Sequence, residues 1–349
     1  MDDLSELNDD YEFCTDAINF HSQAKITLED GKHLVVIEKS YAEGYWYGIY
    51  QFVRNIEKSN DNQIKAIINA ECELKAPTHK ITEWHQTMIG LIRSHDPDCT
   101  YSPHLQLFYN VTMGMDFGNS VTFEKFKELV ERIRVQTKTK TFKKKSRRKQ
   151  ERLSANEKNA LEYIDKIFQN NSRLVILRID LHLKITEIGR LDQHAKIKSN
   201  FEKFLNDRRS NKFFNHELGY IWKFEDGETL GGHYHLIFIL DGAHVQKDEF
   251  IASQIGEYWR KITDGEGTYF NANSKKYLDD LAAHGVGIGL GRIESHDVEK
   301  RANLTRIVKY FFKLEQYVEA KRSPGSRSFA TGRIKKRKGA GGRPRKSKS

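Results

Sequence analysis

Residues 217–240 read ELGYIWKFEDGETLGGHYHLIFIL. Two runs rich in β-branched and aromatic residues, Leu218–Glu225 and His233–Leu240, flank a short segment that contains three glycines. This pattern predicts two strands joined in a β-hairpin. Because side chains i and i+2 of a strand project to the same face, we expect His233 and His235 to point to one side, with Glu225 within reach at the end of the partner strand.

This set of side chains suits a metal ion. Two imidazoles and one carboxylate can hold a divalent cation that keeps open positions for a phosphate oxygen. The apolar run Leu236–Leu240 follows directly, so the two histidines are expected on a rigid strand instead of a mobile loop. The alternative interpretation of the His-x-His pair is a structural one, with no ion bound.

The segments around the hairpin predict the rest of an α+β domain. A strand is expected over Leu174–Leu183, and helices over about Ala195–Asn206, Lys247–Ile262 and His296–Val318. The full order, α-β-α-β-β-α-β-α, predicts an antiparallel sheet with helices packed against it.

Two local patterns add detail to this domain. Ser154 and Glu157 have the spacing of a capping box, which predicts the start of a helix at that point. The run Gly285–Gly291 alternates glycine with apolar residues. At the period of a strand, its four glycines share one face, where a helix or another backbone can approach closely.

The last predicted helix carries a candidate nucleophile. Beside its apolar stripe, Tyr310, Lys313 and Tyr317 project on one flank. Next to a metal site, the phenol of Tyr310 can attack a phosphodiester and form a covalent phosphotyrosine. Lys313, one turn further on, can stabilise the phenolate or offset charge on the phosphorus in the transition state. The alternative is ordinary half-buried packing of the tyrosine.

The net charge of +10 on the 349 residues is concentrated in two segments. Residues 321–349 hold 12 Lys or Arg and no acid, and residues 134–152 hold ten with one acid. Without these segments, 36 basic residues stand against 47 acidic ones. Such runs bind phosphate backbones by counterion release, although solvated linkers and solubilising tails have the same composition. The candidate DNA-binding residues are Lys143, Lys144, Lys145, Arg147, Arg148, Arg343, Arg345 and Lys346.

Composition argues against several classes of protein. No run approaches the roughly 20 apolar residues of a membrane helix, and the acidic N-terminus lacks the features of a signal peptide. The three cysteines are widely spaced and predict no disulfide framework. These features predict a cytoplasmic protein with no membrane partner.

The remaining segments complete the expected organisation. Residues 1–137 are interpreted as a smaller mixed α/β accessory domain of unknown role, with strand-like runs at Leu34–Ile37 and Leu105–Tyr109 and a helix over Thr122–Val135. The charged residues 138–153 are interpreted as a linker, and residues 326–349 as a disordered, DNA-binding tail.

Several motifs resemble those of HUH endonucleases. His233-Tyr234-His235 resembles their histidine-hydrophobic-histidine motif, and Tyr310-Phe311-Phe312-Lys313 resembles their YxxK motif. Leu177–Leu181 resembles the strand that precedes these motifs. The stretches Gly219–Leu240 and Gly256–Trp259 are similar to the YagK/YfjJ C-terminal domain family, which is found in prophages and inovirus-like elements and looks like a set of replication initiators. The resemblance covers roughly residues 154–332, about half of the chain.

The resemblance implies a function and a set of site residues. It implies an HUH nuclease domain over residues 154–325, with a ferredoxin-like or RRM-like sheet. It implies His233, His235 and Glu225 as ligands of Mg²⁺ or Mn²⁺, and Tyr310 as the nucleophile. The implied reaction nicks and rejoins single-stranded origin DNA through a 5′-phosphotyrosine and a free 3′-OH, for rolling-circle replication of a phage or mobile element in a bacterial cell.

Two features depart from the pattern of many replication initiators. The chain contains no GxxxxGK[ST] motif, so a host helicase and polymerase are expected as partners. Tyr317 lies seven residues after Tyr310 instead of the three or four expected of paired nucleophiles, which favours a single nucleophile.

Two other functions remain open at this point. A non-enzymatic DNA-binding or regulatory protein would use the basic segments for affinity and the His-x-His pair as structure. A relaxase or transposase would use the same chemistry on a different DNA substrate. A test of metal dependence would distinguish the DNA-binding protein from a nicking enzyme. The sequence does not distinguish a relaxase or transposase from a replication initiator, because all three use the same chemistry. The oligomeric state is also left open.

Overall fold

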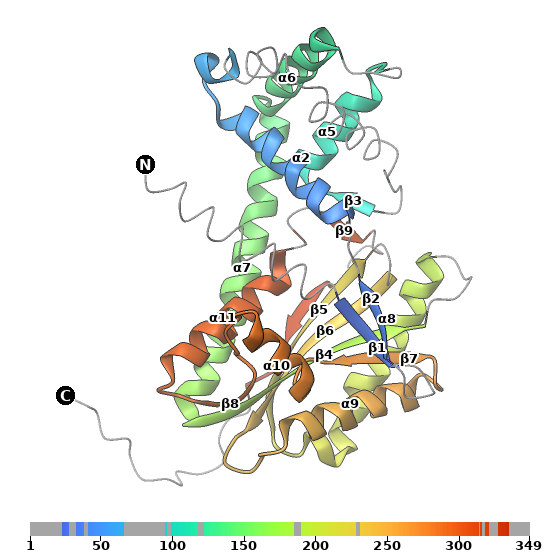
Figure 1. Ribbon diagram of the computed structural model, residues 1–349, viewed down its shortest axis with the longest axis vertical. Helices are drawn as coiled ribbons and strands as arrows, with labels where there is room; N and C mark the ends of the chain where they lie inside the picture. The colour runs from blue at the N-terminus through green and yellow to red at the C-terminus, as the bar shows by residue number, and fades with distance from the viewer. Residues whose placement is uncertain are drawn as a thin grey trace, which may run out of the picture.

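The structure, a computed structural model, describes residues 23–27, 33–37, 41–65, 95, 99–117, 122–184, 190–227, 231–313, 315, 318–320 and 327–334. Its fold is mixed α+β, with a six-stranded antiparallel sheet between layers of helices (Figure 1). No helix among these residues has the length and apolarity needed to cross a membrane.

The sheet is built around the predicted hairpin. Strand β5 (Glu217–Gly227) pairs with β6 (Gly231–Asp241), and β6 pairs with β4 (Arg173–Leu183). The three predicted strands and their antiparallel pairing are confirmed. Shorter strands complete the sheet at its edges: β7 (Gly267–Asn271), β8 (Gly291–Glu294) and β10 (Phe329–Thr331).

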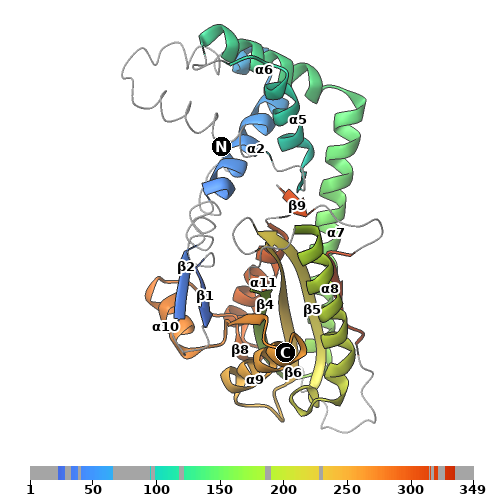
Figure 2. The ribbon, with the colours of Figure 1, turned by 90° about the vertical axis from the view of Figure 1, so that its right-hand side faces the viewer.

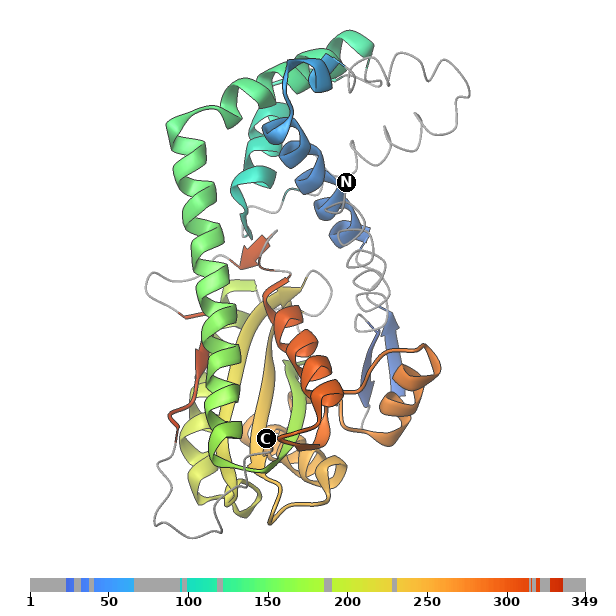
Figure 3. The same cartoon turned by 90° about the vertical axis from the view of Figure 1, so that its left-hand side faces the viewer.

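Each face of the central strands packs on its own set of helices. On one face, Leu174, Ile176 and Ile237 join a core with α7 (Lys140–Asn170), α10 (Lys275–Ala283) and α11 (Val298–Lys313). The opposite face packs on α8 (Arg190–Asp207) and α9 (Asp248–Ile262). Figure 2 shows the sheet between these layers, and Figure 3 shows α7 and α11 side by side on one face, in agreement with their contacts.

The alternating glycines lie against α11 but not in a strand. Residues 286–289 have no regular secondary structure, and β8 begins only at Gly291. A side chain at Gly287 would collide with that of Asn303, and one at Gly289 would collide with the backbone of Asn303 and Leu304. The expected close approach of a helix is therefore confirmed at these two positions, while the strand geometry was wrong.

We expect Gly289→Ala to lower the free energy of unfolding by about 1–3 kcal/mol, because the added carbon overpacks the contact with the α11 backbone. Urea denaturation followed by circular dichroism would measure this change. Gly48→Ala is a matched control, since nothing lies within 4 Å of a side chain placed there. In the interior of helix α2 (Tyr41–Lys58), that substitution should raise stability by up to about 1 kcal/mol. Equal effects of the two substitutions would contradict the close approach.

The basic segment 138–153 is part of a helix and not an irregular linker. α7 starts at Lys140, where the hydroxyl of Thr139 accepts a hydrogen bond from the backbone N–H of Phe142. Ser154 lies inside this helix, so the predicted start at the capping box was wrong. Buried Phe142 and Leu153 explain the difference: the charged run still carries apolar side chains, and Phe142 packs in the core of the N-terminal part.

The N-terminal part contains both strands and helices. β1 (Gln23–Thr27) and β2 (His33–Ile37) pair antiparallel, and α6 (Phe123–Thr137) confirms the predicted helix. The strand expected at Leu105–Tyr109 was wrong, because these residues lie in α5 (Pro103–Met113). Ser102 caps that helix, and Pro103 occupies its first turn.

The C-terminal elements also differ from expectation. α11 ends at Lys313, and Val318 starts strand β9 (Val318–Ala320), which pairs with β3 (Cys99–Tyr101). The tail expected to be disordered from residue 326 instead contributes β10, whose Phe329 packs on Phe312 at 5.0 Å. Contact of Phe329 with the buried ring of Phe312 holds β10 in place, although the basic composition around it suggested disorder.

Candidate metal centre

Glu225, His233 and His235 come together at the end of the β5–β6 hairpin. Strand register places Glu225 opposite His233. The Nε2 atom of His235 lies 3.1 Å from Nε2 of His233 and 3.0 Å from Oε2 of Glu225. One ligand atom from each residue falls within 4.8 Å of the others. The structure therefore unites all three predicted ligands.

The spacing of these atoms fits a divalent cation. Adjacent ligands at right angles around an ion with bonds of about 2.1 Å lie about 3.0 Å apart. Both histidines are buried, with 5% and 8% of their surface exposed. Polar groups at such depth need partners; the three side chains partner one another, and a cation between them would replace these contacts by bonds to all three.

Asp180 on β4 contacts His235 on the side of Nδ1, and Arg178 on the same strand pairs with Asp180. Asp180 lies opposite His235 in the sheet, and its Oδ1 is 2.8 Å from Nδ1 of that histidine. The two atoms are close enough for an ion pair, although the angle falls outside that of a hydrogen bond. Arg178 holds the same carboxylate with Nε at 3.3 Å from Oδ1 and Nη2 at 3.0 Å from Oδ2. A carboxylate behind a ligating imidazole fixes its ring orientation and directs Nε2 to the ion.

The carboxylates of Asp180 and Glu225 stabilise a positive charge at the centre. Burial alone would lower the pKa of His235, but the carboxylates of Asp180 and Glu225 outweigh it and raise that pKa to about 9. Burial likewise opposes ionisation of Asp180, yet Arg178 and His235 hold its pKa well below the usual range. A metal ion at this centre would have to displace that proton, so its binding should weaken as the pH falls.

Replacing Asp180 by asparagine should weaken Mn²⁺ binding about 10- to 100-fold, because the amide no longer orients and polarises His235. Isothermal titration calorimetry with Mn²⁺ alone would measure this loss. Asp241→Asn is the control, since that carboxylate contacts exposed His244 at the other end of β6. Unchanged affinity in the Asp180 variant would remove this residue from the centre.

His182 is a second residue that the sequence analysis did not identify. It is buried two residues after Asp180, and its ring stacks on His233 with centroids 4.9 Å apart. Burial and the neighbouring His233 hold its pKa well below the ordinary value, so this imidazole is neutral. It lies outside the three-residue ligand cluster and packs against one of its members.

Tyr310 lies on the same face of the sheet as the centre. Its neighbour Phe311 packs on His235, with ring centroids 5.5 Å apart. The guanidinium carbon of Arg178 lies 5.9 Å from the centroid of the Tyr310 ring and 5.4 Å from that of Phe311. The half-buried Tyr310 is therefore linked to His235 through Arg178, which contacts the tyrosine ring and pairs with Asp180 beside that histidine. Lys313 is the last residue of α11, and Tyr317 lies outside the described residues.

A second tyrosine near the centre comes from α10. Tyr277 is buried, and both Arg178 and Asp180 act on its ionisation. Burial raises the pKa of Tyr277 far above the ordinary value, and Asp180 adds to this effect. With 7% of its surface exposed, this phenol is poorly accessible to a DNA substrate.

The predicted DNA-binding residues fall in two groups. The first lies on one helix, α7, where all five side chains are exposed: Lys143, Lys144, Lys145, Arg147 and Arg148. The second group, Arg343, Arg345 and Lys346, lies outside the described residues.

Comparison with known proteins identifies the family. No curated protein and no solved structure matches the chain. Residues 132–331, more than half of the chain, match the YagK/YfjJ C-terminal domain. The match includes the basic helix α7, the candidate metal centre, α11 and the edge strand β10. The chain belongs to the YagK/YfjJ C-terminal domain family.

Proposed function

We propose that this protein is an HUH endonuclease that initiates rolling-circle replication of a phage or related mobile element in the cytoplasm of a bacterial cell. It nicks and rejoins single-stranded origin DNA, and its six-stranded sheet is of the ferredoxin-like or RRM-like HUH type. The observation that carries the proposal is the buried cluster of Glu225, His233 and His235, backed by Asp180, on the sheet face that also bears Tyr310.

His233, His235 and Glu225 hold the ion, Mg²⁺ or Mn²⁺. When bound, the ion supplies a Lewis acid that polarises a non-bridging oxygen of the scissile phosphate. The three side chains approach from two strands of one hairpin. Three protein ligands would leave a bound ion able to take a phosphate oxygen as a further ligand.

Tyr310 supplies the nucleophile. Its phenolic oxygen forms a bond to phosphorus as the bond from phosphorus to the 3′ oxygen breaks, and the proton that the phenol loses passes through solvent to the leaving oxygen. The products are a 5′-phosphotyrosine and a free 3′-OH. Attack of a 3′-OH on the phosphotyrosine reverses the step and rejoins the strand without an external energy source, because one phosphodiester bond replaces another. Lys313, one turn from Tyr310, offsets charge that develops on the phosphate.

The exposed basic face of α7 supports binding of the DNA strand. Lys143, Lys144 and Arg147 belong to a run that attracts phosphates without sequence preference. The basic residues after Ile334 add the same kind of affinity. A host helicase and polymerase would supply unwinding and synthesis.

A nicking assay with labelled single-stranded DNA from the element's intergenic region tests the proposal. Wild-type protein with Mn²⁺ should produce a nick and a covalent protein–DNA adduct on a denaturing gel, and chelator should abolish both. The double variant His233→Ala/His235→Ala should lose both products. The control His216→Ala/His244→Ala removes a stacked pair of exposed histidines away from the centre and should retain activity.

The same assay separates the alternative functions. Binding that ignores chelator, with no nick under any condition, would favour a non-enzymatic DNA-binding protein. Metal-dependent cleavage of a transfer origin or transposon end, and not of a replication origin, would favour a relaxase or transposase.

A further inference from the structure

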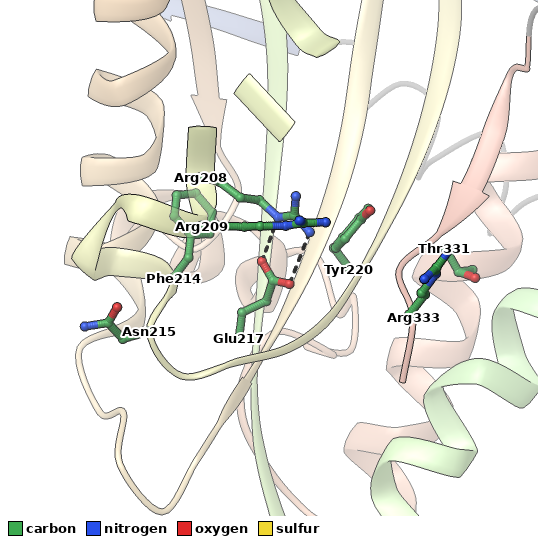
Figure 4. A pocket seen from close by; sticks show the side chains of 8 residues that line it. All are labelled: Arg208, Arg209, Phe214, Asn215, Glu217, Tyr220, Thr331 and Arg333. Atoms are coloured by element: carbon green, nitrogen blue, oxygen red, sulfur yellow. Dashed lines mark hydrogen bonds and ion pairs between the residues drawn. The ribbon is translucent and has the colours of Figure 1, made fainter. Parts of the chain in front are cut away.

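A cavity of about 620 Å³ lies at the sheet edge, away from the metal centre. It is lined by the 3₁₀ turns that follow α8 (Arg208–Ser210 and Lys212–Phe214), by the start of β5, and by β10 with the residues after it. Figure 4 shows Arg208 and Arg209 on one side of Tyr220, with Thr331 and Arg333 on its other side. The size is that of a pocket for a small molecule or a nucleotide.

The lining has a net positive charge. Of its charged residues, three are arginines and one is the carboxylate Glu217. Arg208 and Glu217 are both buried and neutralise each other, with Nε of Arg208 at 2.9 Å from Oε2 of Glu217. In the part of the chain that the structure describes, no ion pair involves Arg209 or Arg333, and both are exposed. Two guanidinium groups are thus available to a ligand.

Tyr220 adds an aromatic surface between these arginines. The guanidinium carbon of Arg208 lies 4.3 Å from the centroid of its ring, and the backbone N–H of Gly332 donates to its carbonyl oxygen. These contacts fix the half-buried residue in place. Arginines around a fixed aromatic ring are the combination that binds phosphates and stacks bases of single strands.

The cavity shares strand β5 with the metal centre, and its residue Arg333 lies close in sequence to the basic tail. Arg333 lies two residues before a segment, residues 335–349, with eight Lys or Arg and no acid. Tyr220 and Glu225 lie on the same strand, five residues apart, which corresponds to about 17 Å. Because five is an odd number, the two side chains project to opposite faces of the sheet: Tyr220 packs on the side of α8 and α9, whereas the metal centre lies on the side of α11. A DNA strand that contacts both sites therefore has to pass around the edge of the sheet.

We propose that this cavity is a second contact site for single-stranded DNA, in which Arg209 and Arg333 bind a phosphodiester and Tyr220 contacts a base. The inference rests on the proposed function for its ligand, but not on the nicking reaction. The cavity binds the part of the same DNA strand that flanks the scissile phosphate.

Binding of a fluorescein-labelled oligothymidylate, measured by anisotropy in chelator over a range of salt concentrations, tests the site. The full-length double variant Arg209→Gln/Arg333→Gln should bind at least about tenfold more weakly than wild type at low salt. The slope of log affinity against log salt should fall by about 1.4, because two phosphate contacts on a single strand are lost. The control Arg260→Gln/Arg292→Gln removes the same charge from surface ion pairs and should match wild type.

A second pair of variants tests the aromatic contact. Tyr220→Phe should bind like wild type, whereas Tyr220→Leu should bind about tenfold more weakly, since only the former keeps a ring for stacking. If the double arginine variant and its control bind equally well, the site is overturned while metal-dependent nicking by wild type still stands. If wild type does not bind single-stranded DNA at all, the proposed function itself fails. If thymidine monophosphate competes as well as the oligonucleotide, the cavity takes a free nucleotide and the inference is wrong.

Discussion

Tyr310→Phe is expected to abolish the covalent protein–DNA adduct and to reduce nicking by a factor of about 10⁴ or more, because the attacking oxygen itself is removed. The substitution leaves the ring in place beside Arg178, so the packing of α11 should be unchanged. Mn²⁺ binding should also be unchanged, since the ligands come from β5 and β6. Loss of the adduct with normal metal affinity would assign the residue to the chemical step.

Two other tyrosines serve as matched controls for this experiment. Tyr277→Phe removes a phenol that lies close to Arg178 and Asp180 but is buried, so the adduct should still form. Tyr317→Phe removes the other tyrosine that the sequence suggests as a nucleophile, and it should likewise leave adduct formation unchanged. An adduct that persists in the Tyr310 variant and disappears in either control would move the nucleophile to that residue. Peptide mapping of the adduct would then identify it directly.

The ligand cluster could be predicted from sequence because strand periodicity is simple. His233 and His235 are separated by one residue in an apolar strand, and a two-residue period places them on one face. Glu225 followed from the hairpin alone. Its register with His233 depends on the loop, and the structure pairs the two residues directly.

The support for that cluster could not be predicted in the same way. Asp180 and Arg178 lie on β4, more than 50 residues before His235, and reach it only because β4 pairs with β6. Their signal in the sequence was two charged residues that alternate with apolar ones inside a buried strand. Such charges need partners, but a sequence does not say which strand provides them.

The basic segment shows where composition misleads. Charge density suggested a linker over residues 138–153, yet the helix that contains them is 31 residues long. Ion pairs one turn apart, such as Arg147 with Glu151, and the apolar contacts of Phe142 and Leu153 compensate for the repulsion. Strands β7 and β10 were missed for a related reason, because short edge strands are defined by their partners more than by their own residues.

The end of α11 is fixed by a buried ion pair that joins three elements. The amine of Lys223 on β5 donates a hydrogen bond to Glu315, just beyond the last residue of the helix, and both side chains are 3% exposed or less. Nη2 of Arg152, on α7, lies 3.3 Å from the other carboxylate oxygen. Burial opposes ionisation of Glu315, but Lys223 and the basic residues of α7 hold its pKa below the usual value. The carboxylate is therefore charged at neutral pH and anchors the segment that follows Tyr310 and Lys313.

Replacing Glu315 by glutamine should lower the free energy of unfolding by about 3–5 kcal/mol, because the ammonium group of Lys223 is left buried without its counter-charge. Urea denaturation at pH 7 would measure the loss. Glu162→Gln is a matched control on α7, where the half-exposed carboxylate contacts Lys158 and Lys166 and should contribute less than about 1 kcal/mol.

The double variant Lys223→Met/Glu315→Leu separates charge from packing. Removing both partners leaves no buried charge, so most of the stability lost in Glu315→Gln should return. Its adduct formation should nevertheless stay below wild type, because apolar contacts do not direct the end of α11 as an ion pair does. A double variant that is as unstable as Glu315→Gln would show that the shape of the cavity, and not the uncompensated amine, determines the loss. Full stability with full adduct formation would remove the ion pair from the positioning of Tyr310.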